Sequence, residues 1–141
     1  MKIAIGADHR GFALKEFLKR EMEMIEWVDV GAFDTERSDY PTFAHHVAQK
    51  IMSGDVTHGI LICGSGAGIS IAANRHQGIF AGVVWNDDVV RAAKADDNIN
   101  VLVIPSDFVS MQEAMRFVRI WLETKFKEGR YQERLDMIER L

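Results

Sequence analysis

Short apolar runs alternate with amphipathic segments along the whole chain. Five runs have the length and composition of β-strands: residues 2–7, 27–30, 59–63, 79–85 and 100–104. The segments between and after them carry apolar residues at helical spacing, which predicts helices over residues 12–22, 41–52, 69–74, 87–95, 110–126 and 131–141. Because strand and helix alternate, we expect an α/β fold, with an open, mostly parallel five-stranded sheet and helices on both of its faces.

Length and composition predict a single domain over residues 1–141. A chain of 141 residues has the length of one domain and can bury a core of its own. Its one cysteine excludes an internal disulfide framework. It has no apolar stretch near the roughly 18 residues that cross a membrane, and its N-terminal apolar run is too short for a signal peptide. We therefore expect a cytoplasmic protein with no membrane partner.

The charge balance argues against nucleic acid as a partner. The 17 Lys and Arg residues are outnumbered by 21 Asp and Glu residues, which gives a net charge of −4. A protein that binds nucleic acid is usually basic, with its cations gathered on one face. A small anionic substrate stays compatible with this charge, because one pocket needs only a few local cations.

The C-terminal segment, residues 131–141, is charged over most of its surface and has a thin apolar stripe of Leu135, Ile138 and Leu141. Such a helix either packs on a neighbouring subunit or caps its own domain. At its start, Arg130 and Arg134 are four residues apart and share a helix face. The two side chains either bind a phosphate together or form a solvated face with nearby glutamates.

In parallel sheets of this kind, ligands bind beyond the carboxyl ends of the strands. We expect three polar segments to reach that edge: residues 8–10, 63–68 and 96–98. His9, beside Asp8, is either a ligand-binding side chain or a loop histidine bonded to backbone groups. The adjacent His45 and His46 face different directions on a helix, and no other histidine spacing predicts a metal site.

The strongest local signal is CGSGAG at residues 63–68. Three glycines free the backbone to turn its N–H groups inward, and the helix that follows adds its positive end, which together favour a bound phosphate or an enolate oxygen. The spacing fits neither a Walker loop nor a dinucleotide fingerprint, so a tight turn is the simpler alternative. Cys63 is either a small buried hydrophobic residue or a thiolate favoured by the helix N-terminus.

Five segments together resemble the ribose-5-phosphate isomerase B family, which includes allose-6-phosphate and galactose-6-phosphate isomerases. They are IGADHRGFALK at 5–15, DVGAFDTERSDYP at 29–41, GILICGSGAGISIAANR at 59–75, NVLVI at 100–104 and EGRYQERLDMI at 128–138. The resemblance implies a Rossmann-like three-layer α/β/α sandwich, a homodimer or tetramer, and neither a metal nor an organic cofactor. It also implies an intramolecular oxidoreductase that interconverts aldose and ketose sugar phosphates through a cis-enediolate.

The resemblance also implies which residues do the chemistry. Cys63 matches the family's base, and Ser65 matches the hydroxyl that moves a proton between O1 and O2. The backbone that holds the negative charge of the enediolate matches Gly64, Gly66, Ala67 and Gly68.

The same resemblance implies the residues that bind the substrate. Asp8 matches a residue that contacts substrate hydroxyls, and Tyr40 matches one that lines the pocket. His9, Arg130 and Arg134 match phosphate contacts. The two arginines are expected to come from the other subunit, so that the active site is shared.

Three positions depart from the family pattern. The family carries His-Asn ahead of the NVL strand, and its His assists ring opening, whereas this chain has Asp96 and Asp97. Asp107 stands where the family has an arginine aimed at the phosphate. Asp96 can still serve as the acid or base of ring opening, with Asp97 beside it on the substrate. Arg10 or Arg91 could replace the missing positive charge.

These residues lead to one expected function and two alternatives. The expected function is interconversion of ribose 5-phosphate and ribulose 5-phosphate. The departures leave open an isomerase of another sugar phosphate, such as allose 6-phosphate, galactose 6-phosphate or another pentose phosphate. They also leave open a weakened paralogue that only binds a sugar phosphate, although Cys63, Ser65 and the glycines argue for an enzyme.

Overall fold

Five parallel strands form one sheet through the middle of the molecule, in the order β2-β1-β3-β5-β4. The computed structural model describes residues 1–141. The strands are β1 (Lys2–Ala7), β2 (Glu26–Asp29), β3 (His58–Cys63), β4 (Ala81–Val83) and β5 (Val101–Pro105). The helices are α1 (Phe12–Glu21), α2 (Tyr40–Met52), α3 (Ala67–Asn74), α4 (Asp87–Asp97), α5 (Met111–Glu123) and α6 (Arg130–Glu139). The predicted α/β fold is confirmed, and the sheet is wholly parallel.

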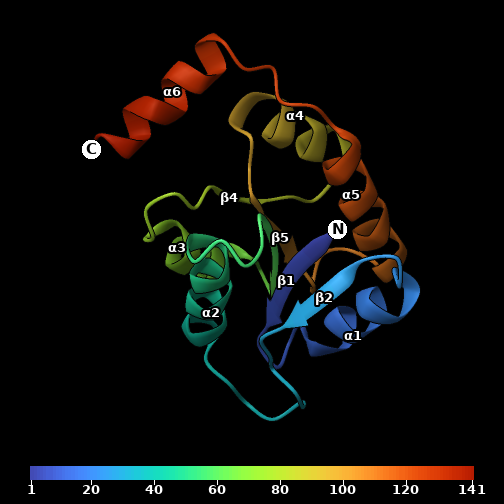
Figure 1. Cartoon of the computed structure of the whole chain (residues 1–141). Coiled ribbons are helices and arrows are strands. Elements are labelled where there is room, and N and C mark those ends of the chain that lie inside the picture. The colour runs from blue at the N-terminus through green and yellow to red at the C-terminus, as the bar shows by residue number, and fades with distance from the viewer.

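Helices cover both faces of the sheet and make three layers (Figure 1). One hydrophobic core lies between the sheet and α1, α4 and α5, and includes the fully buried Leu18, Phe117 and Trp121. The other lies between the sheet and α2 and α3, and includes Val47 and Ile69. β3 and β5 read as continuous apolar runs because helices cover both of their faces.

The order of the strands reverses direction between β1 and β3. From β1 the chain passes through α1 to β2 on one side, then returns through α2 to β3 on the other side of β1. The loops that leave the carboxyl ends of β1 and β3 therefore turn toward opposite helical layers. This switch point, at the lower edge of the sheet in Figure 1, is where open parallel sheets bind their ligands.

β4 is shorter than its apolar sequence predicts. Only Ala81–Val83 pair with β5, although residues 79–85 are nearly all apolar. β4 is the edge strand, so it has one neighbour. Single backbone hydrogen bonds flank it: the carbonyl of Phe80 accepts from the N–H of Asn100 at 3.0 Å, and the N–H of Val84 donates to the carbonyl of Val103 at 3.0 Å. Ile79 lies in the core under α3, and Val84 lies in the core on the other face.

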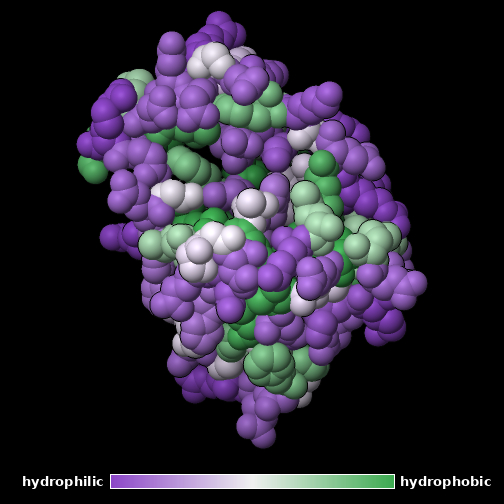
Figure 2. Space-filling view, viewed as in Figure 1, coloured by the Kyte–Doolittle hydropathy of each residue, from purple (hydrophilic) through white to green (hydrophobic).

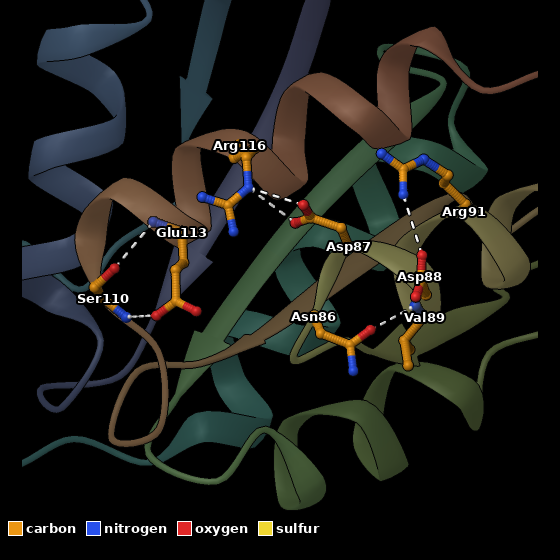
Figure 3. A network of polar contacts seen from close by, with 8 residues as sticks. All are labelled: Asn86, Asp87, Asp88, Val89, Arg91, Ser110, Glu113 and Arg116. Atoms are coloured by element: carbon orange, nitrogen blue, oxygen red, sulfur yellow. Dashed lines mark hydrogen bonds and ion pairs between the residues drawn. The ribbon is translucent and has the colours of Figure 1, made fainter.

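A polar network joins α4 to α5 (Figure 3). The side-chain oxygen of Asn86 caps α4 by accepting a backbone hydrogen bond of 2.9 Å. Ser110 Oγ accepts from the N–H of Glu113 at 3.1 Å, and Glu113 Oε1 accepts from the N–H of Ser110 at 2.8 Å. This capping box starts α5. Arg116 of α5 then donates to both carboxylate oxygens of Asp87 on α4, at 3.0 Å each.

α6 lies apart from the two helical layers, near the end of the sheet where the strands begin (Figure 1). A cavity of about 660 Å³ separates it from α3 and β4, and Figure 2 shows this hollow below α6. The apolar stripe of Leu135, Ile138 and Leu141 lines the cavity. Leu135 is buried, but Ile138 and Leu141 are exposed. The helix therefore covers its own domain only in part.

Candidate active site

Loops from β1 and β3 bring two of the predicted segments together at the carboxyl edge of the sheet. Cys63 is the last residue of β3, and Asp8 directly follows β1. The N–H of Asp8 donates to the carbonyl of Ile62 at 3.3 Å, which ties the two strand ends to each other. The expectation that residues 8–10 and 63–68 reach the same edge is therefore confirmed.

Residues 64–68, which we call the glycine loop, present unpaired backbone N–H groups. Gly66 adopts a φ of 78°, a left-handed conformation that favours glycine, and the chain turns there into α3. Five N–H groups of the loop and the first turn of α3 donate no hydrogen bond within the chain: those of Gly64, Ser65, Gly66, Gly68 and Ile69. Together with the positive end of α3, they can hold a phosphate or an oxyanion.

The thiol and hydroxyl candidates lie on either side of the first glycine of this loop. Cys63 is 5% exposed and belongs to the core under α2 and α3. Ser65 is exposed, and its Oγ accepts from the N–H of Ala67 at 3.2 Å. Because Oγ acts as acceptor there, the hydroxyl proton stays available for a ligand. The thiol therefore lies at the inner side of the loop and the hydroxyl at its outer side.

Asp8 and His9 are held by local hydrogen bonds. Asp8 is 5% exposed, and its Oδ1 accepts from the N–H groups of Arg10 and Gly11 at 3.0 and 3.2 Å. His9 and Ser38 form two reciprocal hydrogen bonds. The His9 N–H donates to Ser38 Oγ at 3.1 Å, and the Ser38 N–H donates to His9 Nδ1 at 3.2 Å. Because Nδ1 accepts, the neutral ring carries its hydrogen on Nε2, which can donate to a ligand. Sequence reasoning missed Ser38.

Tyr40 reaches the glycine loop from the start of α2. A Cβ added to Gly68 would lie 2.6 Å from Tyr40 Cζ, so the aromatic ring rests directly on that glycine. Tyr40 is 39% exposed and therefore also faces solvent. The structure thus gathers Tyr40 with Asp8, His9, Cys63 and the loop at one edge of the sheet.

Arg10 also lies on the glycine loop. Its guanidinium rests against Gly64 and forms an ion pair with Asp107, the residue that follows β5 by two positions. Arg91 instead pairs with Asp88 on α4, at 3.3 Å. Of the two arginines considered from the sequence, Arg10 is the one at the site. Its place directly after Asp8 and His9 was the available signal.

Asp96 and Asp97 lie at the opposite edge of the sheet. They form the last turn of α4, directly before β5 begins. The expectation that residues 96–98 reach the edge of the glycine loop is wrong. A helix that links two parallel strands returns the chain to their amino ends, so residues that precede β5 cannot lie at its carboxyl end.

Arg130 and Arg134 lie at that opposite edge as well. Leu135, between them and the C-terminus, lines a small cavity with Thr57 and Asn100, which precede β3 and β5. β3 has six residues, so its length of about 20 Å separates this edge from the glycine loop. Within one chain the two arginines therefore cannot reach a ligand held by the loop.

These distal residues belong to a basic cluster around Tyr131. Lys127, Arg130 and Arg134 lie 4.9, 5.2 and 5.4 Å from the centroid of the Tyr131 ring. A hydrogen bond from Arg130 and the charges of Lys127 and Arg130 lower the pKa of the Tyr131 phenol. Lys127 also pairs with Asp96 at 2.8 Å, and this hydrogen bond raises the pKa of the lysine. The cluster is an exposed candidate for an anion contact.

None of the six helices combines the length and apolar character that a bilayer crossing requires. No group of three or more His, Cys, Asp or Glu side chains is arranged to hold a metal ion. The groups gathered at the glycine loop are a thiol, a serine hydroxyl, two carboxylates, an imidazole, a phenol, a guanidinium and the backbone N–H groups.

The chain is similar to known sugar phosphate isomerases over almost its full length. The model of the Ribose/Galactose Isomerase family matches residues 3–138. Ribose-5-phosphate isomerase B of Escherichia coli is 41% identical over 139 residues, which cover 97% of this chain and 93% of that protein.

Two solved structures have the same fold. The ribose 5-phosphate isomerase of Thermotoga maritima superimposes with a TM-score of 0.97 at 40% identity, covering 99% of this chain and 98% of that one. Ribose-5-phosphate isomerase B of Mycoplasma genitalium, solved with bound ribulose 5-phosphate, gives a TM-score of 0.93 at 36% identity, covering 99% and 94%. The chain therefore belongs to the ribose/galactose isomerase family.

Proposed function

We propose that this protein interconverts ribose 5-phosphate and ribulose 5-phosphate, with Cys63 as the base. One observation carries the proposal: the only thiol of the chain lies at the end of β3, directly before the glycine loop, which together with the first turn of α3 presents five unpaired backbone N–H groups. A base beside an oxyanion hole is the arrangement that proton abstraction next to a carbonyl requires. A relative of the same fold holds the ketose product.

In the forward direction the Cys63 thiolate takes the proton from C2 of the open-chain aldose. The electron pair of the broken C–H bond forms the C1–C2 double bond, and the carbonyl electrons move to O1. The N–H groups of the glycine loop stabilise the negative charge that develops there. A proton then moves from O2 to O1, and the thiol returns its proton to C1, which leaves the carbonyl at C2.

The surrounding side chains fit the remaining tasks. The free hydroxyl proton of Ser65 suits the transfer between O2 and O1. Asp8 uses Oδ1 to fix its own turn, and its Oδ2 accepts no hydrogen bond within the chain, so it can accept one from a sugar hydroxyl. His9 can donate from Nε2 to a phosphate, and the Tyr40 ring covers the glycine loop at Gly68.

We also propose that a second copy of the chain completes the site. Arg130 and Arg134 are exposed at the edge opposite the glycine loop, and so is Asp97. An anion on the loop of one subunit can meet these residues only if they come from another subunit, which is the arrangement of a closed symmetric dimer. Asp96 and Asp97 would then face the sugar ring of the partner's substrate.

Turnover of ribose 5-phosphate by the wild type and by Cys63→Ala tests the base. We expect the wild type to form ribulose 5-phosphate and the variant to lose about 10²- to 10⁴-fold in kcat with a nearly unchanged KM. Near-normal turnover by the variant would refute the assignment of Cys63. A wild type that ignores ribose 5-phosphate but isomerises allose 6-phosphate or galactose 6-phosphate would refute the substrate and keep the reaction class.

Co-expression of two inactive variants tests the shared site. Cys63→Ala loses the base, and Arg130→Ala with Arg134→Ala loses the phosphate contact. In a hybrid dimer one of the two sites combines the intact loop of one chain with the intact arginines of the other. Random pairing makes about half of the dimers hybrid, so about a quarter of the wild-type activity should return. If the mixture stays inactive while hybrid dimers form, the site is not shared.

A further inference from the structure

Arg10 is fixed to the glycine loop through its backbone. Its N–H donates to Asp8 Oδ1 at 3.0 Å, and its carbonyl accepts from Ser106 Oγ at 3.2 Å. Ser106 Oγ also lies 3.2 Å from the carbonyl of Cys63. The main chain of Arg10 is thus held between the loops that follow β1 and β5, beside the end of β3.

The side chain of Arg10 lies over the first residue of the loop. A Cβ added to Gly64 would lie 2.6 Å from Nε and 2.7 Å from Nη1 of Arg10, so the guanidinium fills the place of a side chain at residue 64. Asp107 pairs with Nη2 and is itself fastened to the loop, because its N–H donates to the carbonyl of Gly64 at 3.0 Å. The guanidinium is therefore fixed over Gly64 by its ion pair with Asp107.

Two observations connect this guanidinium to the outer end of the substrate. Its Nε and Nη1 make no hydrogen bond within the chain, and the side chain is 55% exposed, whereas Cys63 is 5% exposed. A sugar whose reacting carbons reach the buried thiol leaves its opposite end at the rim, where Arg10 lies. Planar N–H donors with a full positive charge suit a phosphate better than a sugar hydroxyl.

We propose that Arg10 binds the phosphate of the sugar phosphate substrate and so determines the preference for phosphorylated sugars, with Asp107 holding the guanidinium in place. This inference rests on the proposed function, because that function supplies the phosphate. Under this proposal, one of the residues that bind the phosphate comes from the same subunit as the glycine loop. The arginines of α6 would add to this site from the partner subunit.

Steady-state kinetics on ribose 5-phosphate with Arg10→Ala and Arg10→Lys test the proposal. Arg91→Ala is a matched control, because Arg91 is also 55% exposed and also paired with an aspartate, but on α4. We expect Arg10→Ala to raise KM about 10- to 100-fold with little change in kcat, and Arg10→Lys to give an intermediate value. Arg91→Ala should match the wild type.

Titration calorimetry with inorganic phosphate gives a second readout that needs no turnover. The assembled wild type and Arg91→Ala should bind phosphate alike, and Arg10→Ala should bind it about 10-fold or more weakly. Equal phosphate affinity in all three proteins overturns the proposal, and so does a fall in kcat at constant KM, which would put Arg10 at the reacting atoms. If the wild type does not isomerise ribose 5-phosphate, the proposed function fails, while calorimetry still decides the role of Arg10.

Discussion

The phenol ring of Tyr40 occupies the space that a side chain on Gly68 would need. A Cβ at residue 68 would lie 2.6 Å from Cζ and 2.9 Å from the hydroxyl oxygen of Tyr40. Tyr40 begins α2 and Gly68 is in the first turn of α3, so the contact joins two helix starts beside the candidate site. The glycine is therefore needed for the closeness of the ring, in addition to its free N–H group.

Substitution of Gly68 by alanine should lower activity more than stability. The added methyl group must displace the Tyr40 ring, and the ring can move outward because it is 39% exposed. We expect kcat/KM to fall about 10- to 100-fold, because a displaced Tyr40 ring beside the glycine loop misplaces the substrate. The melting temperature should change by only about 2 °C. Kinetics and thermal unfolding of the same preparation check both expectations.

The control for this prediction is the same substitution in a chain without the ring. If the methyl group acts through Tyr40, Gly68→Ala should cost little further activity in a Tyr40→Ala background. A cost that is the same with and without the ring would contradict this explanation and assign the effect to a shift of the loop backbone, because alanine keeps the N–H group of residue 68.

Lys15 and Asp29 form the most enclosed ion pair of the chain. Lys15 is completely buried, and its Nζ donates to both carboxylate oxygens of Asp29 at 2.9 and 2.7 Å. Lys19 adds a third hydrogen bond at 2.7 Å, and the N–H of Gly31 a fourth at 2.9 Å. Burial acts to raise the pKa of Asp29, but these hydrogen bonds outweigh it and hold the pKa below its usual value.

Asp29→Asn should therefore be strongly destabilising. It leaves the ammonium of Lys15 buried without a counter-charge, which costs about 3 kcal/mol of unfolding free energy. For a chain of this size the melting temperature should fall by roughly 6–12 °C at a fixed protein concentration. Glu16→Gln is the control, because it removes the exposed partner of Lys19 and should cost under about 0.5 kcal/mol. Equal effects of the two substitutions would show that the buried pair contributes no more than a surface pair.

The elements of the fold were largely predictable because they depend on local pattern and burial. β5 is apolar throughout, and so is β3 after His58, because helices cover both faces of these strands. The glycine loop could also be predicted from a short stretch of sequence, because Gly66 adopts a left-handed conformation directly before a helix. The length of β4 could not be predicted from the sequence, because hydrogen bonding at a sheet edge depends on the neighbouring strand rather than on hydrophobicity.

The arrangement of the site was less predictable because it depends on contacts between distant segments. The ion pair of Arg10 with Asp107 joins the loops after β1 and β5, and no spacing in the sequence indicates it. The position of Asp96 follows from the direction of α4, which returns the chain to the amino ends of the strands. The alternation of strand and helix in the sequence indicates this direction, and the expectation that Asp96 lies at the same edge as the glycine loop conflicts with it. The sequence alone did not show whether the apolar stripe of α6 packs on its own domain or on another subunit. In the structure, the domain buries Leu135 but leaves Ile138 and Leu141 exposed.

The capping box of α5 should contribute measurably to stability. Ser110→Ala removes the acceptor for the N–H of Glu113, while the remaining network of Figure 3 stays in place. We expect a loss of about 1 kcal/mol of unfolding free energy in urea titrations. Arg116→Ala, which removes the half-exposed pair with Asp87, should cost about as much or less. Unchanged stability of Ser110→Ala would show that solvent satisfies the first turn of α5 equally well.

His58, the partly buried first residue of β3, makes stability depend on pH. Its ring packs edge-to-face on the buried Trp121, with 5.1 Å between the ring centroids. Burial of the imidazole lowers the pKa of His58 below its usual 6.5, and the charge of the nearby Lys94 lowers it further. The folded protein thus favours the neutral ring.

The sign of the pH effect follows from this direction. Between the lowered pKa and 6.5, the unfolded chain binds a proton that the folded chain does not. Stability contributed by His58 is therefore complete above about pH 6.5 and decreases as the pH falls below that value. The decrease ends once the pH is below the pKa of the folded state.

His58→Gln should remove this dependence. We expect the plot of unfolding free energy against pH, measured by urea titration from about pH 5 to about pH 7.5, to be flatter below pH 6.5 than that of the wild type. The difference in slope corresponds to the uptake of a fraction of one proton. His46→Gln is the control, because His46 is exposed on α2 and its loss should leave the slope unchanged. Parallel curves for the wild type and His58→Gln would show that His58 takes up its proton equally in the folded and unfolded chains.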